Sequence, residues 1–308
     1  MLNNDLQEAK NAKKDEFYTQ ISDIEIEMEH YKHHFAGKTV YCNCDSPTES
    51  MFYKYFVDNL EALNCKKVIT RGVSILGSEK IYSVATTDKK QRFPMVGCGD
   101  FREKEALSLL ATSDIVVTNP PFSLFREYLA QLIEYDKKFI ILGNVNAISY
   151  KEVFNLIKEN KIWLGASIKS GDREFGVPND YPLEAATCRE DSNGNRFIRV
   201  KGVRWFTNLD YADRYSHEIS LTKIYKPTDY PKYDNFDAIN VNKVKDIPMD
   251  YYGLIGVPIT FLDKYNPNQF EIVGNEYAFD IKGGRTYVGG KRMYSRIFIR
   301  RKENGWNT

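Results

Sequence analysis

The sequence predicts an α/β protein built on a mostly parallel β-sheet. Short runs rich in β-branched residues recur between residues 38 and 165, and each ends at a polar or proline-containing turn, as buried parallel strands do. Segments with apolar residues at helical spacing separate these runs, so helices are expected to join consecutive strands. Two apolar runs near residue 200 predict an antiparallel strand that closes the sheet.

The first strand is expected at 38–45, and Ser46 or Thr48 is expected to cap the helix after it. The central strand, 114–118, stops at two prolines, and Ser123 is expected to cap the following helix. The other strand-like segments are 66–70, 92–102, 138–145 and 161–165. The expected helices are 21–35, 49–59, 103–110, 124–133 and 151–159.

The pattern changes after Ser170. Glycines, prolines and Asn193-Gly194 predict that 170–195 is a long loop or an insert. The runs 196–200 and 203–207 are expected to pair with each other as antiparallel strands. The remaining chain is rich in Tyr, Asp, Asn and Pro, so two domains are expected, 1–215 and a smaller module, 216–308.

The composition is that of a globular protein, with 308 residues, 42% hydrophobic and 28% charged. No apolar run is long enough to span a membrane, and the first residues lack a secretory pattern. The five cysteines form no paired CxxC motif, so neither a zinc site nor a disulfide framework is expected. His33 and His34 are expected to be surface residues at a helix end rather than metal ligands.

The net charge of +1 hides a strongly basic end. Residues 281–308 contain eight Lys or Arg and one Glu, which gives +7, so the rest of the chain carries −6. A basic end on an acidic body favours contact with nucleic-acid phosphates, and a solvated tail is the alternative. Apolar residues alternate with these charges, which favours a strand or hairpin with a basic face. The expected DNA-binding residues are Arg285, Lys291, Arg292, Arg296, Arg300 and Arg301.

The tetrad Asn119-Pro120-Pro121-Phe122 follows the central strand. Each proline fixes its own φ and keeps the preceding residue extended, so the Asn119 amide oxygen and the Pro120 carbonyl are presented side by side. Two acceptors suit an exocyclic NH2 group, and Phe122 offers a flat face to a planar base. The alternative is a strand-ending turn that happens to contain two prolines. If the tetrad is functional, these four residues are the catalytic candidates.

The chain resembles the EcoRI-type adenine-specific DNA methyltransferases, which use S-adenosylmethionine (AdoMet). The resemblance covers nearly the whole chain and rests on the tetrad together with KDEFYTQ at 14–20, VYCNCDSP at 40–47, GDFR at 99–102, RWFTNL at 204–209 and GVPITFLDKYNP at 256–267. It implies a Rossmann-like AdoMet-dependent methyltransferase fold. The residues that it implies for AdoMet binding are Phe17, Tyr18, Thr19, Asn43, Cys44, Asp45, Asp100, Phe101 and Asn119.

Two departures from related enzymes accompany the resemblance. The usual Phe-x-Gly-x-Gly is missing, so Asp45 is expected to contact the amino group of AdoMet instead. No acid for the ribose hydroxyls follows the second strand, where Thr70 and Arg71 stand, and the ribose ligand is left unassigned.

The implied activity is methylation of adenine N6 in double-stranded DNA, on a base flipped out of the helix, in restriction–modification or in protection of phage or host DNA. We expect a monomer without a metal in a bacterial or phage-infected cytoplasm, with a separately acting cognate restriction endonuclease as a possible partner. The alternatives are methylation of cytosine N4, an RNA base or a protein glutamine, and a DNA-binding relative without turnover.

Overall fold

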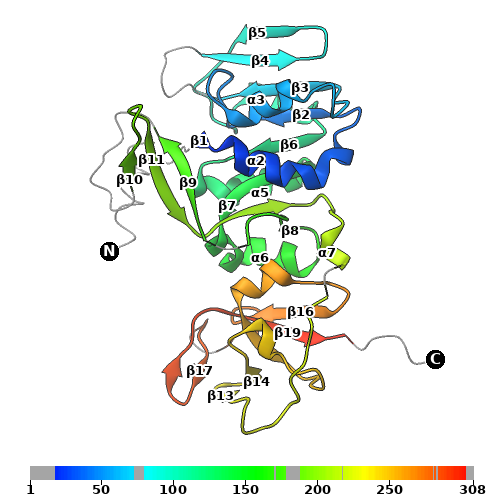
Figure 1. Ribbon diagram of the computed structural model, residues 1–308, viewed down its shortest axis with the longest axis vertical. Coiled ribbons are helices and arrows are strands. Elements are labelled where there is room, and N and C mark those ends of the chain that lie inside the picture. Colours follow the sequence, from blue (N-terminus) through cyan, green and yellow to red (C-terminus); the bar gives the residue numbers. More distant parts are fainter. Residues whose placement is uncertain are drawn as a thin grey trace, which may run out of the picture. The chain divides into compact units, whose positions relative to one another are not determined.

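The computed structural model describes residues 18–72, 80–169, 171–177, 188–216, 218–279, 281 and 284–302 (Figure 1). The chain forms two compact units. The first comprises 1–147 and 164–211, and the second comprises 148–163 and 212–308. The expected functional division at 215/216 stays a prediction.

An eight-stranded sheet is the centre of the first unit. Its order is β5-β4-β3-β2-β6-β7-β12-β8. The four middle strands run parallel to one another, and they are β3 (Lys67–Arg71), β2 (Thr39–Cys42), β6 (Ile115–Thr118) and β7 (Lys138–Asn144). The other strands are β5 (Lys90–Pro94), β4 (Ile81–Ala85), β12 (Val203–Thr207) and β8 (Trp163–Leu164). β12 is antiparallel to β7, as expected for the closing strand, whereas the antiparallel strand β4 was not predicted.

Helices cover the sheet and explain why its middle strands are apolar throughout. All four residues of β2 are buried, which requires cover on both faces. Val40 and Cys42 belong to one buried cluster with Phe52 of α3, and Figure 1 shows α2 and α3 lying along the sheet. The helices of this unit are α2 (Ile21–Met28), α3 (Met51–Asp58), α4 (Lys104–Ala111) and α5 (Phe125–Glu134), with 3-10 helices η1 (Glu29–His34), η2 (Phe122–Leu124) and η3 (Val145–Ser149) near them.

Two expected helix caps are wrong. Ser50 caps α3, because its hydroxyl accepts from the N–H groups of Phe52 and Tyr53 at 3.1 and 3.2 Å. The hydroxyls of Ser46 and Thr48 instead bond each other at 2.9 Å. α5 begins at Phe125 after the turn of η2, so Ser123 does not occupy its cap position.

A second sheet of the first unit corrects the expectations for 170–207. Its order is β1-β9-β11-β10, with β1 (Tyr18–Thr19), β9 (Asp172–Val177), β11 (Arg196–Lys201) and β10 (Cys188–Glu190). The described parts of 170–195 are therefore largely strands, not a loop. β11 and β12 do not pair with each other, because Gly202, at φ +70°, turns the chain from one sheet into the other.

A buried carboxylate fastens α2 to a distant part of the first unit. Glu27 is fully buried and accepts hydrogen bonds from the N–H groups of Ala166 and Ser167 at 2.9 and 2.7 Å. It also accepts from the hydroxyls of Tyr31 and Ser167 at 2.9 and 2.5 Å. Because each carboxylate oxygen receives two donors, the buried charge is well satisfied.

The second unit contains a five-stranded sheet and a separate two-stranded ribbon. The order of the sheet is β13-β14-β15-β19-β16, with β13 (Lys232–Tyr233), β14 (Phe236–Asn240), β15 (Ile255–Pro258), β19 (Arg296–Arg301) and β16 (Phe270–Asn275). The ribbon is β17 (Tyr287–Val288) and β18 (Lys291–Arg292). The helices are α6 (Lys151–Lys158) and α7 (Asp213–Ser216), and the 3-10 helices are η4 (Val244–Asp246) and η5 (Ile259–Lys264).

Candidate active site

Three parallel strands end at one edge of the large sheet, and side-chain hydrogen bonds join their ends. β2 lies between β3 and β6 and is parallel to both, so the residues that follow them meet at the carboxyl edge. Thr118, which ends β6, donates its hydroxyl to the Asp45 carboxylate and accepts from the Cys44 N–H at 3.3 Å. Thr70 of β3 donates to the Asp45 carbonyl at 2.5 Å. Asp45 therefore lies at the junction of the three strand ends.

The Asp45 carboxyl group is buried, and only 8% of the residue is exposed. One carboxyl oxygen accepts from the Ser50 hydroxyl at 2.7 Å and the other accepts from Thr118. Burial raises the pKa of Asp45 to about 6, although these two hydrogen bonds act in the opposite direction. A carboxyl with this pKa is ionised at neutral pH and carries a desolvated negative charge, which attracts a cationic group of a ligand.

Asn43 brings a second polar group to the same strand end. Its side chain is fully buried, and its amide oxygen accepts from the Tyr128 hydroxyl of α5. Its amide nitrogen is also buried and has no hydrogen-bond partner among the described residues. A buried donor without a partner is costly, and such groups occur where a ligand or water completes the bond.

The tetrad continues from Thr118 without a break, so Asn119 lies beside the Asp45 junction. Asn119 is half-buried and Pro120 is buried. Pro121 has φ −55° and ψ 121°, an extended geometry that keeps the tetrad out of the helix until η2 begins. Phe122 is half-buried and packs against the core cluster of the first unit, which fixes the position of its ring.

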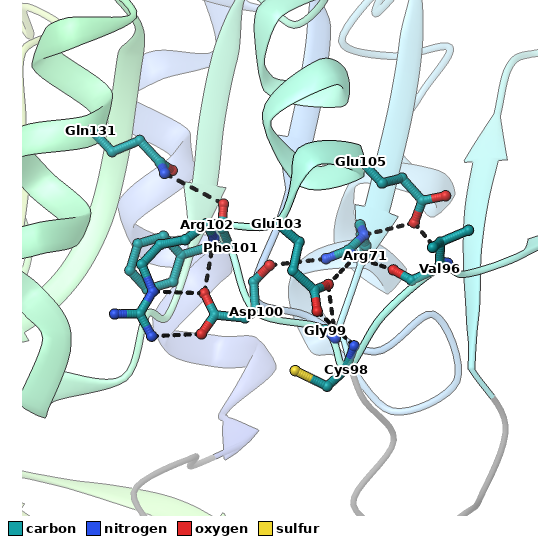
Figure 2. A network of polar contacts seen from close by, with 10 residues as sticks. All are labelled: Arg71, Val96, Cys98, Gly99, Asp100, Phe101, Arg102, Glu103, Glu105 and Gln131. Atoms are coloured by element: carbon teal, nitrogen blue, oxygen red, sulfur yellow. Dashed lines mark hydrogen bonds and ion pairs between the residues drawn. The ribbon is translucent and has the colours of Figure 1, made fainter.

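The end of β3 carries a buried cation (Figure 2). The Arg71 side chain is fully buried and pairs with Glu103 at 2.5 Å and Glu105 at 3.0 Å. It also donates to the carbonyl oxygens of Val96 and Asp100, at 2.8 and 3.2 Å. Arg71 thus holds the segment from 96 to 105 against the strand end where related enzymes are expected to carry an acid. This role was not predicted, because the two acids lie more than 30 positions away in the chain, and the signal in the sequence was an arginine that ends a buried strand.

Glu103 is the second centre of this network. It accepts from the N–H groups of Cys98 and Gly99 at 2.7 and 3.3 Å, in addition to Arg71. Burial by itself raises the pKa of Glu103, but these hydrogen bonds from Cys98 and Arg71 lower it to about 2. The carboxylate is therefore ionised at any physiological pH, and the Arg71 pair persists.

Asp100 and Phe101 lie on the segment that Arg71 holds. The Asp100 carboxylate accepts three hydrogen bonds from Arg102, at 2.8, 2.9 and 2.6 Å, and the side-chain bonds to Arg102 hold the pKa of Asp100 below its usual range. Phe101 is 3% exposed and packs edge-on against Tyr128 with ring centroids 5.0 Å apart. The segment is also tied to α5, because Arg102 donates to Glu127 at 2.8 Å. Adenine recognition by Asp100 stays a prediction.

The N-terminal candidates are placed in part. Phe17 lies outside the described residues. Tyr18 and Thr19 form β1, where their backbones pair with Gly176 and Phe175. Thr19 is buried, and its hydroxyl has no hydrogen-bond partner among the described residues.

The expected DNA-binding residues separate into different environments. Arg296 is 4% exposed, because β19 lies inside the five-stranded sheet rather than at its edge. Its side chain donates to the Asn242 side chain at 2.6 Å. Arg300 is exposed but faces Glu271 at 3.7 Å, and Arg301 stacks on Tyr252. The remaining three, Arg285, Lys291 and Arg292, lie on or next to the β17–β18 ribbon.

The family model for the adenine-specific methyltransferase EcoRI matches residues 5–302. The chain belongs to this family. The Type II methyltransferase M.EcoRI of Escherichia coli is 50% identical over 316 residues, which cover 96% of each chain. The Type II methyltransferases M.MgeORF184P of Mycoplasma genitalium and M.MpnI of Mycoplasma pneumoniae are 39% and 37% identical, each over 96% of this chain and 98% of their own. No solved structure matches the chain.

This protein is therefore a DNA adenine methyltransferase, and the resemblance stated from its motifs is confirmed. Among the described residues, no group of three His, Cys, Asp or Glu side chains has the arrangement of a metal site. None of the described helices is both long and apolar enough to cross a membrane.

Proposed function

We propose that this methyltransferase uses AdoMet to methylate N6 of an adenine flipped out of double-stranded DNA. The observation that carries the proposal is the junction at the carboxyl edge of β2 and β6. There, Thr118 bonds the buried carboxylate of Asp45 and directly precedes Asn119. These two strand ends thus present a buried carboxylate beside an amide oxygen that can accept a hydrogen bond. The carboxylate suits a positively charged methyl donor, and the amide oxygen suits the amino group that receives the methyl group. The order of parallel strands in the first unit supports a Rossmann-like methyltransferase fold.

The residues at this edge fit AdoMet. Asp45 carries the desolvated charge that an ammonium group requires, and the buried amide nitrogen of Asn43 is a donor that lacks a partner among the described residues. Asp100 has accepting capacity left on one oxygen, because Arg102 occupies the other with two bonds. We assign Asp45 to the amino group of AdoMet and Asp100 to its adenine, with Phe17, Tyr18, Thr19, Cys44 and Phe101 lining the same site.

AdoMet supplies a methyl group on a positively charged sulfur, which is already activated for transfer. The protein must hold the acceptor nitrogen in line with that methyl group, and positioning of this kind can supply most of the rate. The Asn119 oxygen and the Pro120 carbonyl accept the two hydrogens of the adenine amino group, and the prolines keep both acceptors fixed. Extrusion of the base costs on the order of a few kcal/mol, and stacking on Phe122 returns about 1–3 kcal/mol.

The biological setting that we propose is restriction–modification or protection of phage or host DNA. The relatives are named Type II methyltransferases, which favours a site-specific enzyme whose cognate nuclease acts as a separate protein. We propose a monomer that acts in a bacterial cytoplasm, and we assign DNA contact to the second unit, where Arg285, Lys291 and Arg292 lie on or next to the β17–β18 ribbon.

The test is the substitution Asn119→Ala, compared with Asn144→Ala. Asn144 ends β7, the next parallel strand, and its side chain bonds the backbone of Lys201 and Asn146. Asn119→Ala should abolish formation of N6-methyladenine on duplex DNA and leave AdoMet affinity within about twofold, whereas Asn144→Ala should keep turnover. Near-normal turnover of Asn119→Ala would exclude Asn119 from the reaction. N4-methylcytosine as the product would exclude adenine as the substrate.

A further inference from the structure

The β17–β18 ribbon differs from the other basic surfaces of the second unit in being held rigidly from one side. The Asp234 carboxylate accepts from the N–H groups of Gly289 and Gly290 at 2.9 and 2.7 Å, and the Asp234 N–H donates to the Tyr287 carbonyl at 2.8 Å. Asn235 donates to the Arg285 carbonyl at 2.8 Å. Both the turn and the base of the ribbon are therefore fixed, so little conformational entropy remains to be lost on binding.

The tip of the ribbon is a two-residue glycine turn that touches the unit through Asp234 and is open in the directions of its Cβ positions. Gly289 and Gly290 have φ values of +57° and +74°, which suit a two-residue turn that matches the twist of a ribbon. A Cβ atom added at either glycine would meet nothing within 4 Å. Figure 1 shows β17 at the margin of the second unit. A slender two-stranded ribbon has the dimensions that the major groove of DNA admits.

The two faces of the ribbon have different roles. Val288 and Met293 pack against the buried cluster that contains Phe298. Tyr287 is paired with Arg292 across the ribbon, and cross-strand partners share a face. Neighbours along a strand alternate, so these two residues lie on the face opposite Val288 and Met293. That outer face presents one cation beside an aromatic ring, and Tyr294, two residues further on, is 88% exposed.

Arg292 is exposed and pairs with no acid among the described residues. Two other exposed arginines have acidic partners, Arg189 with Glu174 at 2.5 Å and Arg300 with Glu271 at 3.7 Å. The carboxylate nearest to the ribbon turn, that of Asp234, is engaged by backbone N–H groups instead. A guanidinium without an acidic partner, held on a rigid ribbon, is suited to a ligand that offers hydrogen-bond acceptors.

We infer that the β17–β18 ribbon enters the major groove of DNA and that Arg292 selects a base pair of the recognition sequence. This inference rests on the proposed function, because it assigns the reading of DNA sequence to one element of the same enzyme. The guanidinium is matched to the O6 and N7 acceptors of guanine, which it binds through two parallel hydrogen bonds. Lys291, at the tip, is placed to contact a phosphate.

The experiment compares Arg292→Ala with Arg189→Ala, which removes an exposed arginine of β10 that is already paired with Glu174. Each protein is given AdoMet and a pool of random-sequence duplexes, and the modified adenines are mapped by sequencing. The unaltered enzyme should methylate one sequence motif, and Arg189→Ala should keep it. Arg292→Ala should relax one position of the motif, with discrimination there reduced roughly 5- to 150-fold, equivalent to about 1–3 kcal/mol. Arg292→Gln should change the preferred base at that position, because glutamine favours adenine.

Two outcomes would overturn the inference. In the first, Arg292→Ala keeps the full motif. In the second, it weakens binding equally for all sequences and lowers the salt slope by about 0.9, which identifies a phosphate contact. If the unaltered enzyme methylates no adenine, the proposed function fails. The ribbon is then judged on the sequences that the same proteins retain from the pool by binding alone.

Discussion

Asp45 should make this methyltransferase less stable at neutral pH than an uncharged side chain would. The ordinary pKa of the group is 3.8, and burial raises it to about 6 in the folded protein. Well below pH 3.8 the carboxyl is protonated in both the folded and the unfolded protein, so its burial carries no charge penalty. Well above pH 6 it is ionised in both states, and the folded state bears the full cost of the buried charge. Since one unit of pKa corresponds to about 1.4 kcal/mol, that cost is about 3 kcal/mol.

The substitution Asp45→Asn removes the charge and keeps an acceptor for one of the two hydroxyls. The free energy of unfolding of the variant, minus that of the unaltered protein, should therefore rise by about 3 kcal/mol between about pH 3 and pH 7. Urea unfolding of both proteins at intervals of half a pH unit measures the difference. Parallel profiles would show that Asp45 does not titrate in this window and would refute the reasoning. AdoMet affinity gives an independent reading: it should fall as the pH drops below about 6 in the unaltered protein and be weak at every pH in the variant.

Two further substitutions test the supports of the site. Arg71→Met leaves Glu103 and Glu105 without their cation and should cost about 3–5 kcal/mol of unfolding free energy in urea titrations. Arg71→Met should also raise the KM for AdoMet more than it lowers kcat. If Arg71→Lys restores the KM, the positive charge alone is sufficient to support AdoMet binding. Gly72→Ala would place a methyl group 2.6–2.8 Å from the Asp45 backbone, so calorimetry should detect at least tenfold weaker AdoMet binding and a stability loss of about 1–3 kcal/mol. Gly194→Ala, whose methyl group meets nothing within 4 Å but whose φ of +81° strains an alanine, should lose stability and leave AdoMet binding unchanged. Equal losses of AdoMet binding in the two variants would contradict the argument.

Local pattern was sufficient to predict the centre of the fold. The strands 38–45, 114–118 and 138–145 are buried on both faces, so their apolar runs are unambiguous, and β2, β6 and β7 lie within those ranges. The tetrad could be placed at a strand end because two prolines cannot continue a ladder.

Strand partners were harder to predict, because pairing is decided by residues far apart in the chain. β11 and β12 are separated only by Gly202, which resembles a hairpin in the sequence, yet each strand joins a different sheet. β9 was missed because Gly176 and the charged residues before it are typical of loops, although its backbone pairs with β1 and β11.

Local pattern was sufficient to place Asn119 and Asp45 after strands of the large sheet, and their roles in the reaction stay predictions. Contacts that join several distant residues were missed. Arg71 gained meaning only from Glu103 and Glu105, which lie more than 30 positions away and reach it through the fold. Arg296 shows the opposite error, because its charge suggested a surface role while its strand lies in the middle of a sheet.

The carboxylate of Glu27 has a consequence for synthesis on the ribosome. Its backbone donors at 166 and 167 are translated about 140 residues later. Until then Tyr31 is the one donor already made of those described for the Glu27 carboxylate, and the partner of β1 at 175–176 has not yet been made. The segment from β1 to η1 should therefore wait, exposed to proteases and chaperones, while the middle of the large sheet assembles first. A nascent chain stopped at residue 147 should be cleaved preferentially between residues 18 and 35.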